Sequence, residues 1–436
     1  MTTEQKQQKT LNAGQQAACD GFFSFLFTDQ KELIISGAGG VGKTFLMGYL
    51  IDEIMPRYYD TCSLMNIDPK YHSVEMTATT NKAAEVLGEA TNRPTSTVHS
   101  FLGLRVKENF STGRTELIRT RNWKMEEGII LFVDECSMID IALRKELLAS
   151  TFNCKIVYVG DHSQLPPVFE ELSPIYRDNL PFFELTEPMR NADHPELMEV
   201  CQQLRETVAT GIFKPIKAIP GVIDWLDAEQ TESAIMDHFV NQETDSRILA
   251  YSNVQVNDLN QYIRTARQLP AEFTVGEHLI SNSAVQLGTS GGFAVEEAVT
   301  ILRIASEPEL IDIGNAQFYA RRMDLEGAYK KTFFDVLVPE DKAHFDQLCK
   351  YFAGQKDWVS YFKLKNNYPD LRPRDVCTVH KSQGSTYDTV FIDMENLSKC
   401  TQPKVAARLL YVAFTRARHR VIMYGNLAKR LGGIIE

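Results

Sequence analysis

The stretch GAGGVGKT occupies residues 37–44 and follows the apolar run LII at residues 33–35. The residues FLMGYL continue from position 45, so a glycine-rich loop lies between a predicted strand and a predicted helix. In that setting, backbone N–H groups can approach a triphosphate at a helix N-terminus. Lys43 can reach the β and γ phosphates, and the Thr44 hydroxyl can hold Mg²⁺. The stretch therefore predicts an α/β P-loop fold that binds a nucleotide, and a plain glycine turn is the alternative.

Length and composition indicate a globular protein of several domains. The chain has 436 residues, 44% hydrophobic and 24% charged, which predicts two to four domains and argues against disorder. Its eight cysteines are scattered without a C-x-x-C pair, which is typical of reduced thiols in a cytosol. The N-terminus resembles no export signal, and no apolar run is long enough to cross a bilayer. A cytoplasmic location without membrane attachment is predicted.

The charge is distributed unevenly along the chain. The formal net charge is −11, from 46 basic and 57 acidic residues, which by itself argues weakly against a polyphosphate partner. Residues 105–124, however, contain six Lys or Arg and two acidic residues, and residues 401–435 contain seven Lys or Arg and no acidic residue. Each cluster is either a solvated helix face or part of a nucleic-acid surface.

Two further apolar runs end in polar side chains. GIILFV at residues 128–133 has the composition of a buried parallel strand and leads into Asp134 and Glu135. Ligands bind at the carboxyl ends of such strands, so Asp134 can hold Mg²⁺ and Glu135 can polarise an attacking water. KIVYV at residues 155–159 is a third such strand, and Gln164 beyond it can contact the γ-phosphate. A solvated strand end is the alternative for the carboxylates.

Eight motifs in order carry a family resemblance. They are GAGGVGKT (37–44), TATTNKAA (77–84), TVHSFLGL (97–104), VDECSM (133–138), GDHSQLPPV (160–168), LTEPMRN (185–191), TVHKSQGSTYD (378–388) and LLYVAFTRAR (409–418). This set resembles the superfamily 1 helicases of the RecD and Dda branch, and in length and order it is most similar to the Dda helicases of tailed phages. The residues LNAGQ at 11–15 resemble the adenine-reading Q motif of that family.

The resemblance implies a fold class and a domain order. The fold is α/β, with two RecA-like parallel-sheet P-loop lobes, a small β-hairpin insert and an SH3-like β-barrel accessory domain. The expected segments are 1–100 and 125–180 for lobe 1A, 101–124 for the hairpin insert 1B, 181–270 and 372–436 for lobe 2A, and 271–371 for the accessory domain 2B. Alternating runs at 273–279 and 299–304 suggest the barrel, and residues 341–352 and 358–362 look helical.

The resemblance also implies roles for single residues. ATP and Mg²⁺ are the implied cofactors. Arg190 and Arg416 match motif arginines that approach the γ-phosphate as arginine fingers. Further nucleotide-binding positions are Gln15, Gly37, Gly40, Gly42, Phe45, Gln383 and Gly384. The implied DNA contacts are Thr80, Asn81, His99, Asn253, Thr378, His380 and Ser382. Polar residues of this kind can equally be helix caps, so that alternative stays open.

The segment 106–117 is a plausible β-hairpin with turn residues at 111–113. Its place matches the strand-separating pin of the family. Phe110 near the tip could stack on the base pair at a DNA fork, where one step of duplex stacking is worth roughly 1.4 kcal/mol. Alternatively, Phe110 packs into a small local core.

Three classes of function are compatible with these motifs. The first is an ATP-dependent DNA helicase that moves on single-stranded DNA, 5′ to 3′ by resemblance, and opens forked duplexes. The second is a P-loop enzyme that phosphorylates a small molecule, and the third is a nucleotide-switched recruiting protein or a translocase without strand separation. The helicase reading adds a single-strand-binding or replication protein as a possible partner, a monomeric state, and the host cytoplasm if a phage encodes the chain.

Overall fold

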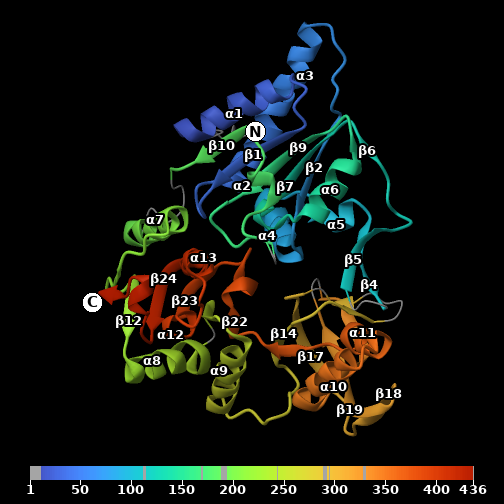
Figure 1. Cartoon of the computed structure of the whole chain (residues 1–436), viewed down its shortest axis with the longest axis vertical. Coiled ribbons are helices and arrows are strands. Elements are labelled where there is room, and N and C mark those ends of the chain that lie inside the picture. The colour runs from blue at the N-terminus through green and yellow to red at the C-terminus, as the bar shows by residue number, and fades with distance from the viewer. Residues whose placement is uncertain are drawn as a thin grey trace, which may run out of the picture. The chain divides into compact units, whose positions relative to one another are not determined.

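The computed structural model describes residues 11–110, 114–167, 170–187, 194–242, 244–287, 292–293, 295–327 and 330–435 (Figure 1). The chain divides into two compact units. The first unit comprises Met1–Leu104 and Arg119–Glu199, and the second comprises Arg105–Ile118 and Val200–Glu436.

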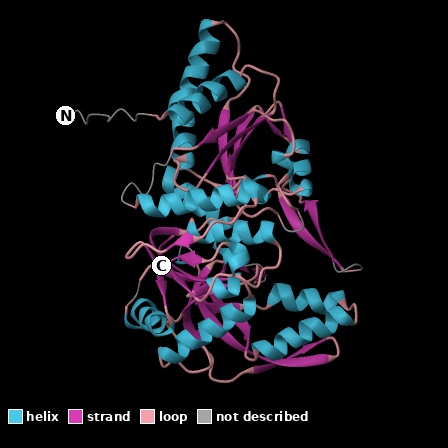
Figure 2. Ribbon diagram, turned by 60° about the vertical axis from the view of Figure 1, so that its left-hand side comes forward, coloured by secondary structure: helices cyan, strands magenta, loops and turns pink. Residues whose placement is uncertain are grey.

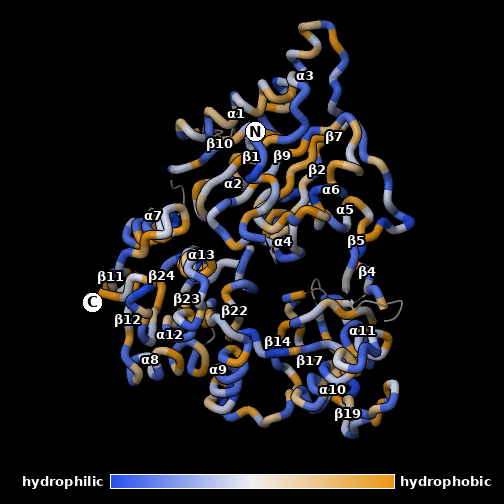
Figure 3. Tube along the Cα trace, in the orientation of Figure 1, coloured by the Kyte–Doolittle hydropathy of each residue, from blue (hydrophilic) through white to orange (hydrophobic). Residues whose placement is uncertain are grey.

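The first unit is built on a parallel sheet with the strand order β10-β1-β9-β7-β2-β3. Its strands are β1 (Glu32–Gly37), β2 (Ser73–Ala78), β3 (Ser96–Thr97), β7 (Ile129–Asp134), β9 (Lys155–Gly160) and β10 (Phe182–Leu185). Every residue of β1 and β9 is buried, as expected for strands covered on both faces, and much of β7 and β9 is orange in Figure 3. The strands predicted around residues 33–35, 128–133 and 155–159 are confirmed.

Helices flank this sheet (Figure 2). They are α1 (Ala13–Phe25), α2 (Lys43–Tyr49), α3 (Met55–Leu64), α4 (Asn81–Thr91), α5 (Val98–Phe101) and α6 (Ile141–Ala149). Short elements complete the unit: η2 (Cys136–Met138), η3 (Pro174–Tyr176), β6 (Glu126–Glu127) and β8 (Thr151–Phe152). Because β10 pairs with β1, the sheet extends beyond residue 180, where the first lobe was expected to end.

The helix after the glycine-rich loop changes its geometry in the middle. Between α2 and α3 lies a π-helical turn, η1 (Leu50–Ile54), and the N–H of Met55 bonds to the carbonyl of Leu50, five residues back. The next residue, Pro56, has no N–H to donate. The proline therefore accounts for a wider turn at this point of the helix.

The second unit contains another parallel sheet, with the order β12-β24-β23-β13-β22. Its strands are β12 (Ile223–Leu226), β13 (Ser246–Ala250), β22 (Val376–Thr378), β23 (Tyr387–Asp393) and β24 (Ala417–Tyr424). The associated helices are α7 (Pro195–Thr210), α8 (Ala228–Ile235), η4 (Met236–Asn241), α9 (Asn253–Ala266), η6 (Val379–Ser382), α12 (Met394–Leu397), α13 (Pro403–Phe414) and η7 (Lys429–Leu431). A small parallel pair joins β11 (Ile216–Lys217) to β25 (Ile434–Ile435). Two separate chain segments build this lobe, as predicted.

An antiparallel sheet interrupts the second lobe in sequence. Its strands are β14 (His278–Ser281), β17 (Ala298–Ile304), β18 (Glu309–Ile313), β19 (Ala316–Glu326), β20 (Thr332–Pro339) and β21 (Leu371–Pro373). A short antiparallel pair, β15 (Val285–Gln286) with β16 (Gly292–Phe293), lies between β14 and β17 in the sequence. The helices α10 (Lys342–Gly354) and α11 (Trp358–Asn367) confirm the two predicted helical runs.

The sheet differs from the expected barrel in two respects. The pairing order is β18-β19-β17-β14-β21 with β20 on β19, so the described strands do not close into a ring. The strand expected over residues 273–279 begins only at His278. The preceding residues turn instead, and Glu277 accepts hydrogen bonds from the backbone N–H and hydroxyl of Thr274 at 2.6 and 2.8 Å.

The predicted hairpin is present as β4 (Leu104–Asn109) and β5 (Arg114–Arg119). Residues Arg105–Ile118, which fall within the segment 101–124 expected to form the insert 1B, group with the second unit. Within that unit, the ring of Phe110 contacts the ring of Phe362 on α11. Among the described residues, no helix combines the length and the apolar composition needed to cross a membrane.

Candidate functional site

The glycine-rich loop connects the end of β1 to the start of α2. Gly40 and Gly42 have φ angles of 84° and 82°, which L side chains rarely adopt. A Cβ atom on Gly37 would lie 2.7 Å from the carbonyl oxygen of Leu185 and 2.7 Å from Cγ2 of Val41. These positions therefore require glycine, and α2 begins with Lys43, Thr44 and Phe45 directly after the loop.

The ammonium group of Lys43 lies over its own loop. Its Nζ atom donates to the carbonyl oxygens of Gly37 at 2.8 Å and Ala38 at 2.9 Å. Thr44 is in the first turn of α2, where backbone N–H groups have no partner within the helix. This arrangement is the one that a phosphate chain at a helix N-terminus requires.

Gln15 reaches the loop from α1. It is fully buried, and its side-chain Nε2 donates to the carbonyl of Val41 at 3.4 Å. Its Oε1 accepts from the N–H of Asn12 at 3.2 Å, and Asn12 in turn accepts from the N–H of Gln15, which makes a capping box. The structure thus brings the predicted Q-motif residue to the P-loop, and the same amide stabilises the start of α1.

Asp134 and Glu135 lie at the carboxyl end of β7. Asp134 Oδ1 accepts from the N–H of Glu135 at 2.9 Å, and Glu135 adopts a φ of 51° that turns the chain sharply. Burial, and then the neighbouring Glu135, raise the pKa of Asp134 to about 7, while the charge of Lys43 acts in the opposite direction. The two predicted carboxylates and the P-loop lysine therefore share one electrostatic environment.

Gln164 follows β9, the strand between β1 and β7. It is buried, and its N–H donates to the carbonyl of Asp161 at 3.1 Å. Asp161 Oδ1 accepts from the N–H of Ser163 at 3.0 Å, and the ring of His162 is 3.0 Å from Ser36 Oγ on β1. The P-loop, Gln164 and the carboxylate pair thus lie at the ends of three adjacent strands.

The same edge can hold a divalent cation. The described residues contain no group of three or more His, Cys, Asp or Glu side chains that could bind a metal by themselves. Mg²⁺ needs no such cage, because one or two protein ligands and the phosphates of the nucleotide suffice. The hydroxyl of Thr44 and the carboxylate of Asp134 are oxygen donors of the kind it prefers. The residues present fit Mg²⁺ bound together with a nucleotide.

The DNA-contact candidates of the first unit lie beside the strand ends. Thr80 is the N-cap of α4, and its hydroxyl accepts from the N–H of Ala83 at 3.2 Å. Asn81 is the first residue of that helix. His99 lies in α5, and burial lowers the pKa of its imidazole. The capping role that was left open for Thr80 is therefore present, and it does not exclude a second contact of the same residue.

In the second unit, Asn253 begins α9 directly after β13. The turn before it is held by Asn396, whose Oδ1 accepts from the N–H groups of Tyr251 at 2.7 Å and Ser252 at 2.9 Å. Asn396 Nδ2 also donates to Ser252 Oγ at 3.2 Å. Sequence reasoning missed Asn396, because it is 144 residues away from Ser252 in the chain and belongs to no recognised motif.

Thr378, His380 and Ser382 occupy β22 and the short helix η6. Ser382 is fully buried, and its hydroxyl donates to the carbonyl of Val379 at 2.8 Å. Thr378 is also buried, whereas His380 is exposed. Beyond them, Gly384 has a φ of 77° and follows Gln383. Among these three DNA-contact candidates, His380 is therefore the one that presents its side chain to solvent.

Arg416 follows the end of α13 and is buried. Its guanidinium donates to the carbonyls of Val412 at 3.2 Å and Ser385 at 3.1 Å and to the hydroxyl of Thr415 at 3.1 Å. All these acceptors belong to the second unit. The other predicted arginine finger, Arg190, lies outside the described residues.

Phe110 directly follows β4 and has an exposed fraction of 50%. Its ring meets that of Phe362 edge to face, with centroids 5.6 Å apart and an interplanar angle of 83°. The ring thus contacts α11, while the residue as a whole remains half exposed to solvent. The structure combines features of both readings of this residue, a local packing role and an available aromatic face.

Known proteins resemble this chain in parts of its sequence and in its fold. A family model described as an AAA domain matches residues 25–170, and one described as a UvrD-like helicase C-terminal domain matches residues 375–424. The ATP-dependent RecD2 DNA helicase of Deinococcus radiodurans is 33% identical over 377 residues, which cover 81% of this chain and 43% of that protein. This chain therefore spans less than half the length of that relative.

Two proteins named Pif1 are also similar to this chain. The ATP-dependent DNA helicase Pif1 of Campylobacter jejuni is 21% identical, and the alignment covers 88% of this chain and 86% of that protein. A crystal structure of the Pif1 helicase from Bacteroides, in complex with ADP-AlF3 and single-stranded DNA, has a TM-score of 0.53 at 16% identity, covering 98% of this chain and 95% of that chain. This similarity extends to the fold of nearly the whole chain.

Proposed function

We propose, from the support that these matches give to a superfamily 1 helicase of the RecD and Pif1 type, that the chain is an ATP-dependent DNA helicase. It translocates on single-stranded DNA in the 5′-to-3′ direction and unwinds forked duplexes, coupling ATP hydrolysis to closure of its two lobes. The greater closeness to the Dda helicases, the monomeric state, a single-strand-binding partner and a location in the cytoplasm, that of the host if a phage encodes the chain, belong to this proposal.

One observation carries the proposal. The neighbouring strands β1, β9 and β7 end in the P-loop, in the segment of Gln164, and in Asp134 with Glu135. This juxtaposition combines a phosphate cradle, an amide and two carboxylates at one edge of the sheet. A site for hydrolysing a nucleoside triphosphate needs these groups together.

The residues of the first lobe divide the work of hydrolysis. Lys43 stabilises the negative charge of the β and γ phosphates, and Gln15 orients the adenine base of the nucleotide. Thr44 and Asp134 would hold Mg²⁺, which neutralises charge on the transferred phosphoryl group. Glu135 accepts a proton from the attacking water, and Gln164 contacts the γ-phosphate.

The second lobe supplies cations and strand contacts in this proposal. Arg416 and Arg190 approach the γ-phosphate when the lobes close, and such arginines contribute roughly 10³ to 10⁵ in rate in related phosphoryl-transfer enzymes. Gln383 and Gly384 adjoin the nucleotide. The proposed DNA contacts come from both lobes: Thr80, Asn81 and His99 belong to the first lobe, and Asn253, Thr378, His380 and Ser382 belong to the second. Sequence-independent tracking requires contacts of this kind to phosphate and sugar.

Two alternatives predict different products. A kinase of small molecules would use Lys43, Thr44 and Asp134, but it would not need the arginines of the second lobe. A translocase or a nucleotide-switched recruiting protein would respond to DNA without separating strands. A pure switch also has no need of Glu135 as a base.

The test uses two partial duplexes that differ only in carrying a 5′ or a 3′ single-stranded tail. We expect ATP-dependent strand separation of the 5′-tailed substrate, abolished in Lys43→Ala. Lys145→Ala is a matched control, because Lys145 is exposed on α6. Stimulation of ATP hydrolysis by DNA without strand separation would leave a translocase, and no stimulation would overturn the proposal.

A further inference from the structure

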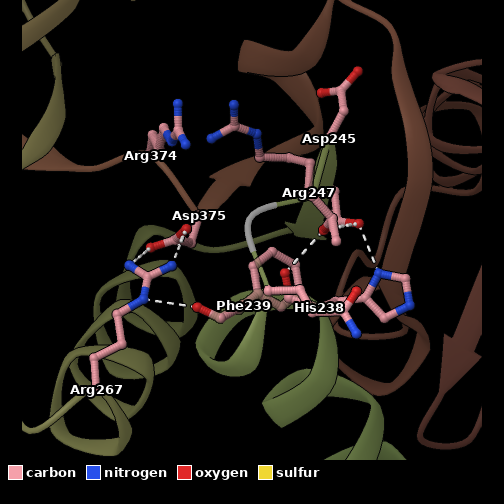
Figure 4. A pocket seen from close by; sticks show the side chains of 10 residues that line it. His238, Phe239, Asp245, Arg247, Arg267, Arg374 and Asp375 are labelled. Atoms are coloured by element: carbon pink, nitrogen blue, oxygen red, sulfur yellow. Dashed lines mark hydrogen bonds and ion pairs between the residues drawn. The ribbon is translucent and has the colours of Figure 1, made fainter.

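A polar pocket lies at the amino-terminal edge of the second lobe's sheet, and none of its lining residues belongs to the motifs used above. Its volume is about 290 Å³, near the lower end of the range for small-molecule sites. It is lined by the residues just before and within the starts of β13 and β22, by the end of η4 and by Arg267 after α9 (Figure 4). Asn253 and Thr378 are at the opposite, carboxyl ends of the same two strands.

Three arginines line the pocket together with two aspartates. Arg267 is already neutralised, because its guanidinium binds both carboxylate oxygens of Asp375, at 2.7 and 2.9 Å, and its Nε donates to the carbonyl of Phe239 at 2.7 Å. These bonds fix one wall of the pocket and consume the charge of Asp375. Arg267 is therefore a structural part of the site.

The second aspartate, Asp245, pairs with an arginine that does not line the pocket. Asp245 accepts a hydrogen bond from Arg418 at 2.6 Å, and Arg418 lies on β24. Asp245 is exposed, and in Figure 4 its carboxylate points away from the centre of the pocket. Neither aspartate therefore has its ion pair with Arg247.

Arg247 has no salt bridge to any of the described residues, and its charge is stabilised mainly by Tyr387 and more weakly by Cys377 and Asp375. Its Nε atom is buried without a hydrogen-bond partner among them, and its guanidinium carbon lies 4.8 Å from the centroid of the Tyr387 ring. Figure 4 shows the guanidinium groups of Arg247 and Arg374 reaching toward the same part of the pocket. Two like charges in a recessed site favour an anion between or beside them.

The floor of the pocket carries hydroxyl groups in a fixed arrangement. Thr244 Oγ1 donates to the carbonyl of His238 at 2.8 Å and is 2.8 Å from Ser246 Oγ. Ser246 Oγ is in turn 2.8 Å from Nδ1 of His238. The lining is therefore predominantly polar, although Phe239 also contributes to it.

We propose that this pocket binds a phosphate group, with Arg247 and Arg374 as its main cationic contacts. Guanidinium forks match the oxygens of a phosphate bidentately, which single lysines do not. The phosphate can come from a small molecule, such as inorganic phosphate or a nucleotide, or from the backbone of a nucleic acid. The site is separate from the P-loop, and its existence does not depend on the helicase proposal.

The test is calorimetric titration of the full chain with inorganic phosphate, without ATP hydrolysis as a readout. The P-loop also binds phosphate, so the wild type, Lys43→Ala and Arg247→Gln are compared. We expect Lys43→Ala to retain one phosphate site and Arg247→Gln to weaken that site by roughly tenfold or more, since a charge-assisted hydrogen bond is lost. Equal phosphate binding in Arg247→Gln and the wild type, or no phosphate site in Lys43→Ala, overturns the proposal.

A second variant protects the test against misfolding. If Arg247→Gln fails to fold, as judged by its melting temperature in chloride buffer, Arg374→Gln takes its place, because Arg374 precedes β22 and is outside any strand. A matched control is Arg303→Gln, whose guanidinium binds Asp324 and Asp335 in the accessory sheet. That control should bind phosphate as the wild type does, and a loss equal to that of Arg374→Gln contradicts the assignment.

The two sources of phosphate are separated by competition in the Lys43→Ala background. Displacement of inorganic phosphate by a thymidine oligonucleotide, with a parallel loss of oligonucleotide affinity in Arg247→Gln, assigns the site to a nucleic-acid backbone. Binding of phosphate or a nucleotide that the oligonucleotide leaves unchanged assigns it to a small molecule.

Discussion

The first and second lobes each carry polar residues predicted to act on a nucleotide, but the two sets are held in different ways. At the end of β1, glycines with positive φ and the nearby lysine form a cradle from fewer than ten consecutive residues. At the end of α13, Arg416 is fixed by its own helix end and by the carbonyl of Ser385, 31 residues away. The first arrangement is local, and the second depends on tertiary contacts.

This difference suggests a division between binding and catalysis. A cradle made of local backbone can bind a nucleotide in the first lobe alone. An arginine that acts on the same phosphate from the second lobe must exchange the acceptors it has there for phosphate oxygens. Variants of the first lobe should therefore weaken nucleotide binding, while Arg416 variants should mainly lower kcat.

The largest expected effect tests this division directly. Arg416→Ala should lower the kcat of DNA-stimulated ATP hydrolysis by roughly 10³ while leaving nucleotide affinity nearly unchanged, because the arginine acts on the transition state. Steady-state kinetics and titration with a fluorescent ADP analogue measure the two quantities. Arg420→Ala is the control, since Arg420 on β24 is paired with Asp224. A kcat within tenfold of the wild type would contradict the assignment of Arg416.

The hairpin sharpens the comparison, because it follows the first lobe's motifs in sequence but groups with the second unit. Phe110→Ala should slow strand separation roughly ten- to a hundredfold, given that base–aromatic stacking is worth about 1–3 kcal/mol. ATP hydrolysis stimulated by single strands should change by less than about twofold. Unwinding and ATPase assays on the same preparation measure both rates.

Two controls separate stacking from packing at Phe110. Phe334→Ala removes a ring with an exposed fraction of 72% on β20 and should have no effect on unwinding. Phe362→Ala removes the ring on which Phe110 packs. If Phe110→Ala unwinds DNA at the wild-type rate, the pin assignment is wrong. If Phe362→Ala, which keeps the Phe110 ring, slows unwinding as much as Phe110→Ala does, the loss comes from packing on α11 rather than from stacking on a base.

A smaller effect concerns the metal side of the first lobe. The pKa of Asp134 is raised to about 7, so the protonated carboxyl dominates below that pH and the carboxylate above it. A protonated carboxyl is a poor Mg²⁺ ligand, and the apparent Mg²⁺ affinity should therefore fall about tenfold between pH 8 and pH 6. Mg²⁺ titrations of nucleotide binding at several pH values measure this change. Asp134→Asn should retain only the pH dependence of the nucleotide, and identical profiles would refute the role of Asp134.

The smallest effect compares one threonine from each lobe. Thr80 caps α4 through its hydroxyl, whereas Thr378 precedes η6 without a side-chain capping bond. Thr80→Ala should thus cost about 1 kcal/mol of stability, and Thr80→Ser should recover most of it. Thermal unfolding checks this order, with Thr378→Ala expected to lose less. A larger loss in Thr378→Ala would show that this capping difference does not govern stability.

Much of the first lobe could be predicted from the sequence because its signals are local. The apolar run before Asp134 predicts a buried strand, and β7 ends at that residue. The glycines before Lys43 predict a phosphate-binding loop between a strand and a helix, and the structure has such a loop between β1 and α2, with positive φ at Gly40 and Gly42. In both places, the residue types that specify the backbone lie next to the residues that carry the chemistry.

Other features could not be predicted because their causes are distant in the chain. No local pattern indicates that β10 completes the first sheet or that Asn396 holds the turn before Asn253. The expected barrel closure also depends on how strands far apart pair, and the described strands remain an open sheet. Such contacts are selected by packing of the whole chain.

The sequence by itself determined that this chain has a P-loop with a carboxylate pair and a series of motifs that resemble superfamily 1 helicases. Local steric preferences and strand composition were sufficient to predict these features, because the conformation of glycine and the burial of a strand depend on only a few consecutive residues. Only the tertiary structure decided that Gln15 reaches the P-loop, that Phe110 packs on α11, and that Arg247 and Arg374 line one pocket. These contacts join segments that are far apart in the chain. The spacing of residues along the sequence does not specify which distant segments will meet in space.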